Sequence, residues 1–314
     1  MSTICIGADV GGTSIKLGIF SLDGSMIKKW EIKTRREDNC KAVIGDIAAS
    51  IREELEKAGY RLRDCVGIGM GVPGPVMPNG YVEVCVNLGW RDRYPARELS
   101  DILEGIPVRI GNDANIAALG ETWQGGAKGF RDVVMVTLGT GVGGGIIIDN
   151  KIVEGRHGLA GEIGHIHIRE GEKEFCNCGG RGCLEQVASA TGIAREAKRL
   201  LTSRPSEESR MRKHGEHLSA KNVLDAAKAG DKLAGEVMDT VADFLGLALS
   251  YLTLTIDPDV FVIGGGVSKA GSFLSEKIEE AHAKYLAISK KHPKIVLATL
   301  GNDAGIYGGA RLVL

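Results

Sequence analysis

A glycine-rich turn between two apolar strands occurs once in each half of this 314-residue sequence. In the first half, Asp9-Val-Gly-Gly-Thr13 joins two strand-like runs, 4–10 and 14–20. In the second half, Thr137-Leu-Gly-Thr-Gly-Val-Gly-Gly-Gly145 joins the run 132–138 to another apolar run. Strand-like runs joined by such turns predict antiparallel hairpins. We therefore expect a similar meander in each half, although the halves share no residue-level repeat.

Two domains are expected, because 314 residues exceed the size at which one hydrophobic core usually suffices. Strands alternate with helix-like segments such as 39–58, which predicts an α/β architecture. We expect a small domain formed by residues 1–113 and about 300–314, and a large domain formed by 114–299 that contains the cysteines described below. The segment 305–313 is expected to be a helix that packs on the first domain.

The glycine turns do not match the common nucleotide-binding loops. Gly139-x-Gly141-x-x-Gly144 has the spacing of the dinucleotide fingerprint, but that motif requires a helix next, and the following residues are strand-like. No Walker loop is present, since no Gly-Lys-Ser or Gly-Lys-Thr follows a glycine loop. A hairpin tip with backbone N–H groups can instead bind phosphate, and glycine lets the oxygen atoms approach. A plain hairpin turn is the alternative.

Two such turns, together with a third glycine run at 264–266, favour a phosphate site. Thr13 and Thr140 add hydroxyl donors. Lys16 can place a cation near a phosphate, or it is an ordinary surface charge, and Asp9 can hold Mg²⁺ directly or through water. The candidate nucleotide-binding residues are Asp9, Gly11, Gly12, Thr13, Lys16, Gly139, Thr140, Gly141, Gly264, Gly265 and Gly266.

Three cysteines and a histidine lie in one short stretch, at His165, Cys176, Cys178 and Cys183. Cys-x-Cys-x₄-Cys with one histidine upstream supplies the four ligands of a closed structural zinc site. A disulfide with one spare thiol is the alternative. His167 is a competing ligand, since it lies two residues from His165 and points to the same side of an extended segment.

Several polar residues near these motifs can bind a polar ligand. Asp113 lies where an apolar strand meets a helix, a rigid junction suited to a general base, and an ordinary helix N-cap is the alternative. Asn112 beside it offers an amide. Glu162 and Glu185 flank the cysteines, and carboxylates accept several hydrogen bonds from a polyol. Each glutamate taken singly is more often a solvated surface residue.

The composition excludes several classes of protein. Hydrophobic residues make up 43%, charged residues 25%, and the formal net charge is -1. This profile is typical of a globular protein without a basic surface for nucleic acid. The N-terminus lacks a signal-peptide pattern, and the apolar stretch at about 244–256 is too short for a bilayer. Seven cysteines, several in apolar contexts, favour a reducing compartment. We expect a cytoplasmic protein that binds neither nucleic acid nor a membrane.

Taken together, the motifs resemble the ROK family of sugar kinases and repressors. The resemblance is carried, in the family's order and over nearly the whole chain, by Asp9-Val-Gly-Gly-Thr13-Ser-Ile-Lys16, Gly111-Asn-Asp-Ala-Asn115, Thr137 to Gly145, Glu162-Ile-Gly-His165, Cys176-x-Cys178-x₄-Cys183-Leu-Glu185 and Gly264-Gly-Gly-Val267. It implies the two-domain actin-like ATPase fold (ribonuclease H-like, sugar kinase) with a cleft between the domains. Family members are often dimers or tetramers, so a homo-oligomer is expected.

The resemblance also implies an activity. It is strongest to the ATP-dependent glucokinases of the family, so ATP with Mg²⁺ is the expected donor and glucose the expected hexose. N-acetylmannosamine or another hexose is the alternative substrate, and polyphosphate the alternative donor. A sugar-sensing repressor is less expected, because those members carry an added N-terminal helix-turn-helix domain. An actin-like ATPase that uses the fold mechanically would not need the cysteine and glutamate cluster.

Single residues receive roles from the same resemblance. It implies that Asp113 is the general base and that His165, rather than His167, binds a structural Zn²⁺ with the three cysteines. The sugar ligands that it implies are Asn112, Asp113, Glu162, His165 and Glu185. The loops 71–75 and 87–90 are expected to decide between hexoses. Because the metal would orient His165, its removal should weaken sugar binding more than nucleotide binding.

Overall fold

The computed structural model describes residues 3–314, and the chain divides into two compact units. The first unit contains the chain up to Asp132, Gly145–Gly161 and Thr299–Leu314, and the second contains Val133–Gly144 and Glu162–Ala298. The chain therefore passes between the units four times. The boundary expected after residue 113 differs from this division, because the helix that begins there packs inside the first unit.

Five strands form the sheet of the first unit, in the order β3-β2-β1-β4-β7. They are β1 (Ile4–Val10), β2 (Ser14–Ser21), β3 (Met26–Lys33), β4 (Cys65–Val72) and β7 (Val108–Asn112). The first three are antiparallel neighbours, whereas β4 runs parallel to β1 and β7 runs parallel to β4. The hairpin predicted around the first glycine turn is present, and its register pairs Asp9 with Lys16.

The helices of the first unit are α1 (Glu37–Cys40), α2 (Val43–Lys57), α3 (Pro95–Ile102), α4 (Asp113–Gln124) and α10 (Ala304–Leu312), with 3₁₀ turns η1 (Leu62–Asp64) and η5 (Gly301–Asp303). A two-stranded sheet, β5 (Val82–Cys85) and β6 (Trp90–Arg93), precedes α3. The helix predicted at 39–58 begins at Val43, because Asp38, Asn39 and Cys40 adopt left-handed conformations that interrupt it.

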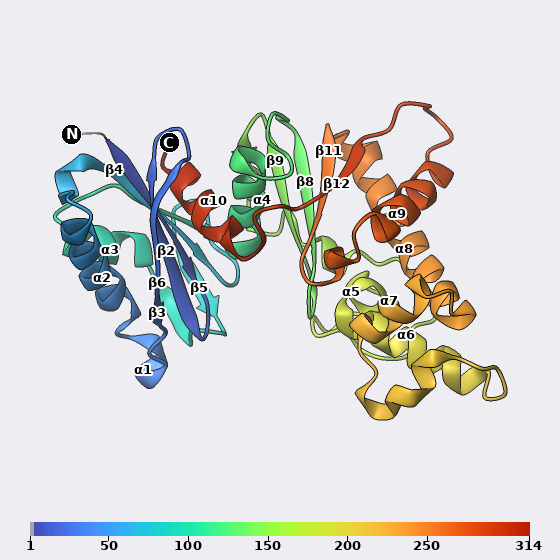
Figure 1. The fold of residues 1–314 in the computed structure, drawn as a ribbon. Coiled ribbons are helices and arrows are strands. Elements are labelled where there is room, and N and C mark those ends of the chain that lie inside the picture. The colour runs from blue at the N-terminus through green and yellow to red at the C-terminus, as the bar shows by residue number, and fades with distance from the viewer. Residues whose placement is uncertain (1–2) are drawn as a thin grey trace. The chain divides into compact units, whose positions relative to one another are not determined.

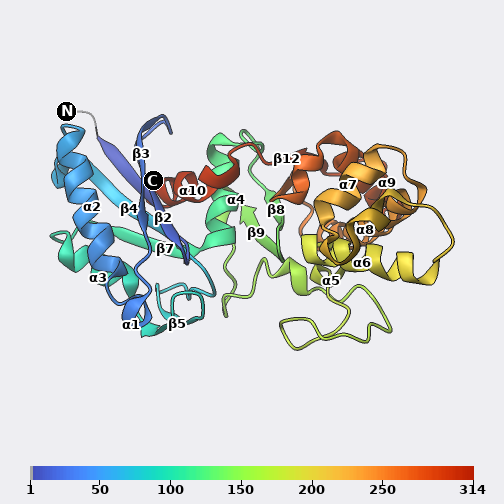
Figure 2. The same cartoon turned by 60° about the horizontal axis from the view of Figure 1, so that its bottom comes forward.

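Both faces of the first sheet are covered by helices (Figures 1 and 2). In β1, Ile4, Ile6 and Ala8 alternate with Cys5 and Gly7, and successive side chains of a strand point to opposite faces. The first set belongs to the core that includes α2 and α3. The second set faces α10. The sheet is therefore buried on both sides.

Helix α10 approaches the sheet and α4 at distances that only glycine allows. A Cβ atom on Gly308 would collide with the carbonyl oxygen of Ile116 in α4. A Cβ atom on Gly69 in β4 would collide with the carbonyl oxygen of Gly309. Any larger residue at these positions would push the backbones apart. The helix expected at 305–313 is thus present, and its glycines set how closely it packs.

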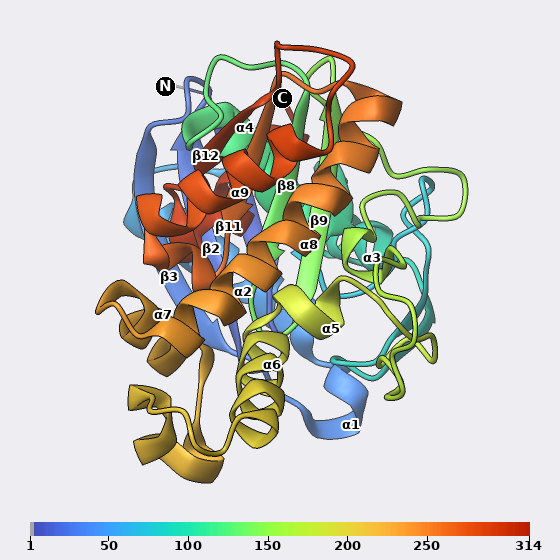
Figure 3. The ribbon, with the colours of Figure 1, turned by 90° about the vertical axis from the view of Figure 1, so that its right-hand side faces the viewer.

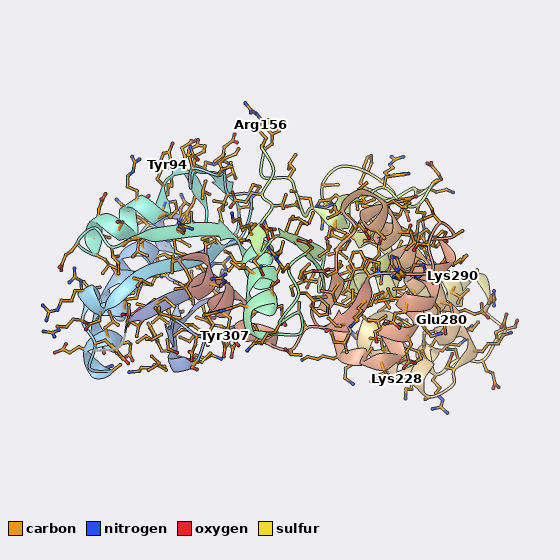
Figure 4. The ribbon with its side chains drawn as sticks, turned by 90° about the horizontal axis from the view of Figure 1, so that it is seen from above. Tyr94, Arg156, Lys228, Glu280, Lys290 and Tyr307 are labelled. Atoms are coloured by element: carbon orange, nitrogen blue, oxygen red, sulfur yellow. The ribbon has the colours of Figure 1, made fainter. Side chains whose placement is uncertain are left out.

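Aromatic rings also pack where α10 meets β2 and α4. The ring of Tyr307, labelled in Figure 4, lies 4.8 Å from the ring of Phe20 in β2. Trp123 of α4 lies 6.3 Å from Phe20, so rings from three separate elements meet. Such tilted pairs add stability beyond the apolar area that they bury.

The second sheet has the order β10-β9-β8-β11-β12. Its strands are β8 (Val133–Leu138), β9 (Val142–Ile148), β10 (Lys151–Ile152), β11 (Val260–Gly264) and β12 (Lys294–Leu297). β8, β11 and β12 run parallel, and β10 pairs antiparallel with β9. Every residue of β11 is buried, as expected for a strand in the interior of a parallel sheet. The second predicted glycine turn joins β8 and β9.

Helices α6 to α9 of the second unit form a group in which α8 is the longest (Figure 3). The elements are η2 (Ile163–His165), α5 (Glu185–Ala188), α6 (Ala190–Ser203), η3 (Arg210–His217), α7 (Ala220–Lys228), α8 (Lys232–Ile256), η4 (Val267–Ala270) and α9 (Ser272–Lys284). Within residues 3–314, α8 alone is long and apolar enough to match a membrane span by length and composition, and 56% of its most apolar window is buried inside the structure.

Candidate active site

The first glycine turn is held in shape by Thr34, which follows β3. Gly11 N–H donates to Ser14 O at 3.0 Å and closes the turn. The Thr34 hydroxyl donates to Gly11 O at 2.7 Å, and Thr34 N–H donates to Thr13 O at 3.0 Å. Thr34 is only 1% exposed, whereas Thr13 at the tip is exposed. No motif singles out Thr34, because only the folded sheet brings the end of β3 beside the turn.

Asp9 lies next to this turn and to the start of α10. A Cβ atom on Gly305 would lie 2.7 Å from Asp9 Cγ, so the carboxylate needs glycine at that position. Burial raises the pKa of Asp9, and the charge of Lys16 opposes this rise. Lys16 Nζ donates to Asn302 O at 3.3 Å. The structure thus places the expected magnesium ligand and the expected phosphate cation beside the same turn, near the positive end of the α10 dipole.

Asn112, and not Asp113, caps the N-terminus of α4. Asn112 Oδ1 accepts hydrogen bonds from Ala114 N–H at 2.9 Å and from Asn115 N–H at 3.2 Å. Its Nδ2 donates to Gly74 O at 3.1 Å, which fastens the loop after β4. Asp113 is the first helical residue, and its exposed carboxylate accepts from Ala114 N–H at 2.9 Å. The cap that competed with a catalytic role for Asp113 is therefore supplied by its neighbour.

The loop expected to influence the choice of sugar, 87–90, packs against α1. Trp90 is 1% exposed, and its Nε1 donates to Cys40 O at 3.4 Å. Gly89 has a φ of 67° and leaves no room for a side chain beside Asn39. The loop borders a cavity of about 650 Å³ in the first unit, which is lined by residues of 38–41 and 84–93. The shape of this cavity thus depends on the α1 segment as well as on the loop.

The second glycine turn is fastened to the start of α6. Gly139 N–H donates to Gly141 O at 2.9 Å and closes the turn. Ala190 N–H donates to Gly139 O at 2.8 Å, and the Thr191 hydroxyl donates to Thr140 O at 3.1 Å. The backbone of the turn is therefore fixed from outside, as Thr34 fixes the first turn.

The third glycine run lies beside the second turn. Gly265, which follows β11, has a φ of 83°, and a Cβ atom there would meet the backbone of Leu138 at 2.5 Å. Leu138 is the last residue of β8 and directly precedes the turn. Ser268 donates to Gly265 O at 2.8 Å. Two of the three expected nucleotide-binding runs are thus neighbours within the second unit.

Glu185 connects the second turn to the cysteines. Its Oε2 accepts a hydrogen bond from Val142 N–H at 3.0 Å, and its Oε1 lies 3.8 Å from Cys176 Sγ. A Cβ atom on Gly141 would collide with this carboxylate, so a larger residue there would displace it. A carboxylate has about four lone-pair positions. Glu185 can therefore accept hydrogen bonds from a sugar in addition to holding the turn.

The four expected zinc ligands come together. The donor atoms of His165, Cys176, Cys178 and Cys183 all lie within 4.8 Å of one another. Cys178 and Cys183 Sγ are 3.7 Å apart, and His165 Nδ1 lies 3.8 Å from Cys176 Sγ. Ligands that share one tetrahedral zinc at bond lengths of about 2.3 Å would be separated by about 3.7 Å. The four thiol and imidazole donors therefore fit a structural zinc ion, and the cysteines are free thiols rather than a disulfide.

His167 forms contacts with residues other than the cysteines. Its Nδ1 lies 2.7 Å from Arg181 O, and its Nε2 lies 3.2 Å from Glu170 Oε1. Both ring nitrogens thus have protein partners. His165 instead directs Nδ1 toward Cys176, and its Nε2 lies 3.9 Å from Glu162. One ring nitrogen thus faces the cysteines, and the other is directed toward the side of Glu162.

The loop that carries the cysteines is anchored to α6 by ion pairs, of which Glu172 is the buried member. The guanidinium of Arg199 donates to both oxygens of Glu172 at 2.8 Å, and this contact lowers the pKa of Glu172 to about 2. Arg199 also donates to Glu174 at 2.8 Å. Gln186 Nε2 donates to Glu174 O, and its Oε1 accepts from Cys183 N–H. These contacts hold both ends of the loop through protein groups alone.

The expected site residues thus form two groups. Asp9, Lys16, the first turn, Asn112 and Asp113 belong to the first unit. The second turn, the third glycine run, Glu162, His165, Glu185 and the cysteines belong to the second unit. Thr34 in the first group, and Ala190 and Thr191 in the second, support these residues without having been predicted from the sequence.

The sequence model of the ROK family matches residues 5–314. The chain belongs to the ROK family. A glucokinase of Halalkalibacterium halodurans is 43% identical to this ROK protein over 312 residues, which cover 98% of this chain and 94% of that one. A ROK family glucokinase from Streptomyces griseus, solved in complex with glucose and AMPPNP, is 32% identical with a TM-score of 0.75 over 98% of each chain. A ROK hexokinase from Thermus thermophilus is 30% identical with a TM-score of 0.82, covering 98% of this chain and 97% of that one.

The fold of this ROK protein is therefore the actin-like ATPase fold of the family's sugar kinases, as the order of its motifs predicted.

Proposed function

We propose that this ROK protein is an ATP-dependent glucokinase, which transfers the γ-phosphoryl group of ATP to the 6-hydroxyl of glucose. The similarity to glucokinases extends over nearly the full length of both chains. The observation within the chain that carries the proposal is the start of α4, where Asn112 supplies the cap and Asp113 presents an exposed carboxylate. A rigid helix start is a suitable position for a base that must meet one hydroxyl group.

Asp113 is the general base in this proposal. The sugar oxygen attacks the γ-phosphorus while its proton passes to an Asp113 oxygen, and the bond from phosphorus to the β–γ bridging oxygen breaks, so that ADP leaves. Phosphoryl transfer needs positioning and charge neutralisation more than covalent help from the protein. A single carboxylate on a rigid backbone is therefore sufficient to accept the proton of the hydroxyl group.

The glycine turns are the proposed phosphate sites. Thr34 fixes the first turn and α6 fixes the second, so their backbones are set before nucleotide binds. Preorganised N–H groups stabilise the charge of a transferring phosphoryl group without reorganising during the reaction. Asp9 is the proposed ligand of Mg²⁺, directly or through water, because it is a partly buried carboxylate beside the first turn. Lys16 is the proposed cation.

The sugar is proposed to bind Asn112, Asp113, Glu162, His165 and Glu185. Asn112 has committed its oxygen and one amide hydrogen to the fold, so at most its second amide hydrogen serves the sugar. Zn²⁺ on His165 and the three cysteines would fix the position and tautomer of the imidazole. The zinc site would thus shape the sugar pocket, while the phosphoryl transfer itself would use Asp113, the glycine turns and Mg²⁺.

A coupled assay over a panel of hexoses and donors tests the proposal. We expect the highest kcat/KM with glucose and ATP, compared with N-acetylmannosamine, allose and fructose, and with polyphosphate as the donor. A clear preference for an N-acetylated sugar would contradict the assignment of glucose. ATP hydrolysis at the same rate without any sugar would contradict the assignment as a sugar kinase.

A further inference from the structure

Glu121, near the C-terminal end of α4, is a fully buried acid without a role in the proposed chemistry. Its Oε2 accepts hydrogen bonds from Gly126 N–H at 2.8 Å and from Thr299 N–H at 3.0 Å. Its Oε1 accepts from Leu300 N–H at 2.9 Å. Within residues 3–314, all partners of this carboxylate are backbone N–H groups. A buried carboxylate is retained only where such bonds replace its lost hydration.

These three N–H groups belong to two different connections between the units. Thr299 and Leu300 are the first residues after the chain returns from the second unit to the first. Gly126 lies in the segment that leads from α4 to the crossing after Asp132. That segment has a second bond, since Ala127 N–H donates to the Glu121 carbonyl at 3.1 Å. One side chain therefore holds an outgoing and a returning connection together.

The surroundings of Glu121 show that this contact is closely packed. A Cβ atom on Gly125 would collide with Glu121 Oε2, so glycine is needed where the outgoing segment leaves α4. The returning segment continues directly into η5 and α10, and a negative charge is favourable near the N-terminal end of a helix. Both connections are thus held at α4 by specific hydrogen bonds.

We propose that Glu121 is a positioning residue, which fixes two of the connections between the units onto the helix that begins with Asp113. Asp113 and Glu121 lie on the same helix, about two turns apart. A movement of the second unit that shifts Thr299 would therefore also shift Glu121 and the helix that carries the proposed base. The kinetic consequence rests on the proposed function, whereas the anchor itself does not.

Replacement of Glu121 by Gln tests the kinetic consequence. The amide keeps the size of the side chain but places an NH₂ group against at least one N–H donor, so one connection loses its acceptor. We expect kcat/KM for glucose to fall by about tenfold or more, with kcat and KM changing together, because residues at connections often affect both. Kinetics are measured well below the melting temperature of the variant.

Thr122→Val is the matched control. Thr122 is the next residue of α4, is 7% exposed, and donates its hydroxyl to Ala118 O within the helix. A purely structural role for Glu121 predicts that both variants lose stability and keep kcat and KM within about twofold of wild type. That result for Glu121→Gln would overturn the proposal.

Hydrogen exchange on the unmodified protein provides a second test that does not require the Gln variant to fold. We expect the amides of Gly126, Thr299 and Leu300 to be protected by about 100-fold or more, because each donates a hydrogen bond to the buried carboxylate of Glu121. Protection should stay within about threefold when glucose and AMPPNP are added, as for a fixed anchor. Exchange as fast as in an exposed loop, or a larger change with ligands, would overturn it. Because the free protein is measured first, the anchor and the glucokinase proposal can fail separately.

Discussion

Asp113 meets two requirements of a general base at the level of the single residue: its carboxylate is exposed, and its backbone belongs to a capped helix. Asn112 supplies the cap through two hydrogen bonds. The sequence could not distinguish which of the two adjacent polar residues caps the helix, because Asp and Asn are nearly equivalent N-caps. The structure resolves this, because Asn112 at the end of β7 has the extended backbone of an N-cap and Asp113 is already helical.

Asp113→Asn removes the proposed proton acceptor and keeps the shape of the side chain. We expect kcat to fall by about 10²–10⁴-fold, the usual contribution of general base catalysis. KM for glucose should stay within about threefold, since the amide still forms hydrogen bonds. Steady-state kinetics and a circular dichroism spectrum provide the measurement. Asp225→Asn, the same change on the exposed surface of α7, is the control. A near wild-type kcat for a folded Asp113→Asn variant would exclude Asp113 as the base.

Thr34→Val removes one hydrogen bond from the first glycine turn. The buried hydroxyl that donates to Gly11 O is lost, while the Thr34 N–H bond to Thr13 O can remain. A lost buried bond costs about 1–3 kcal/mol, part of which should appear in nucleotide binding. We expect KM for ATP to rise by about five- to tenfold and KM for glucose to change less. Thr34→Ser retains the hydroxyl and should behave as wild type. An equal rise in both KM values would indicate general damage instead.

At the level of elements, the strands were predicted well and the helix starts less well. The hydrophobic runs of β1 and β2 have a two-residue pattern that fixes strand type and face. Helix α2 starts at Val43 because the three residues Asp38, Asn39 and Cys40 are left-handed, and no pattern of side chains signals this. The apolar stretch 244–256 forms the second half of α8, which begins at Lys232.

The cysteine loop is an element whose metal ligand can be tested directly. His165→Ala should lower the bound zinc measured by mass spectrometry, whereas His167→Ala should not, because the partners of His167 are Arg181 O and Glu170. Removal of zinc by a chelator should weaken glucose binding more than AMPPNP binding in calorimetry, since the metal would orient His165. Equal weakening would indicate that the effect passes through Glu185 to the second turn, with which it shares a hydrogen bond.

At the level of the whole molecule, the order of the motifs predicted the fold, and the boundary of the first unit was the weaker expectation. The motifs report local turns and strand ends, which have sequence signatures. The contact of Gly308 with Ile116 and the bonds of Glu121 join segments far apart in the chain. These contacts keep α4 in the first unit, and no local pattern could have indicated them.

The stability of the molecule should fall in mild acid because of His282. This histidine of α9 is 1% exposed, contacts Thr253 of α8 at 2.8 Å, and its ring lies 5.8 Å from that of His292. Burial, and secondarily His292, lowers the pKa of His282 to about 4. The unfolded state, with a pKa of about 6.5, therefore binds the proton more readily. The stabilising contribution is complete above about pH 6.5 and is lost as the pH falls toward 4.

Between pH 7 and pH 5 this one group should remove about 2 kcal/mol of the unfolding free energy. Urea denaturation at the two pH values measures the loss. His282→Gln should be less stable than wild type at pH 7 but should lose less stability between pH 7 and pH 5. If both proteins lose the same amount, other groups control the acid sensitivity.

The glycine contacts of α10 have a consequence for biosynthesis. Strands β1 and β2 leave the ribosome early, but the helix that covers their second face consists of residues Ala304–Leu312. Until that segment has emerged, the part of this face around Cys5 and Gly7 lacks the helix that covers it. Apolar residues of the first unit therefore remain exposed while the ribosome synthesises nearly the whole second unit. A nascent chain of this kind is a natural client for chaperones that bind exposed apolar strands during translation.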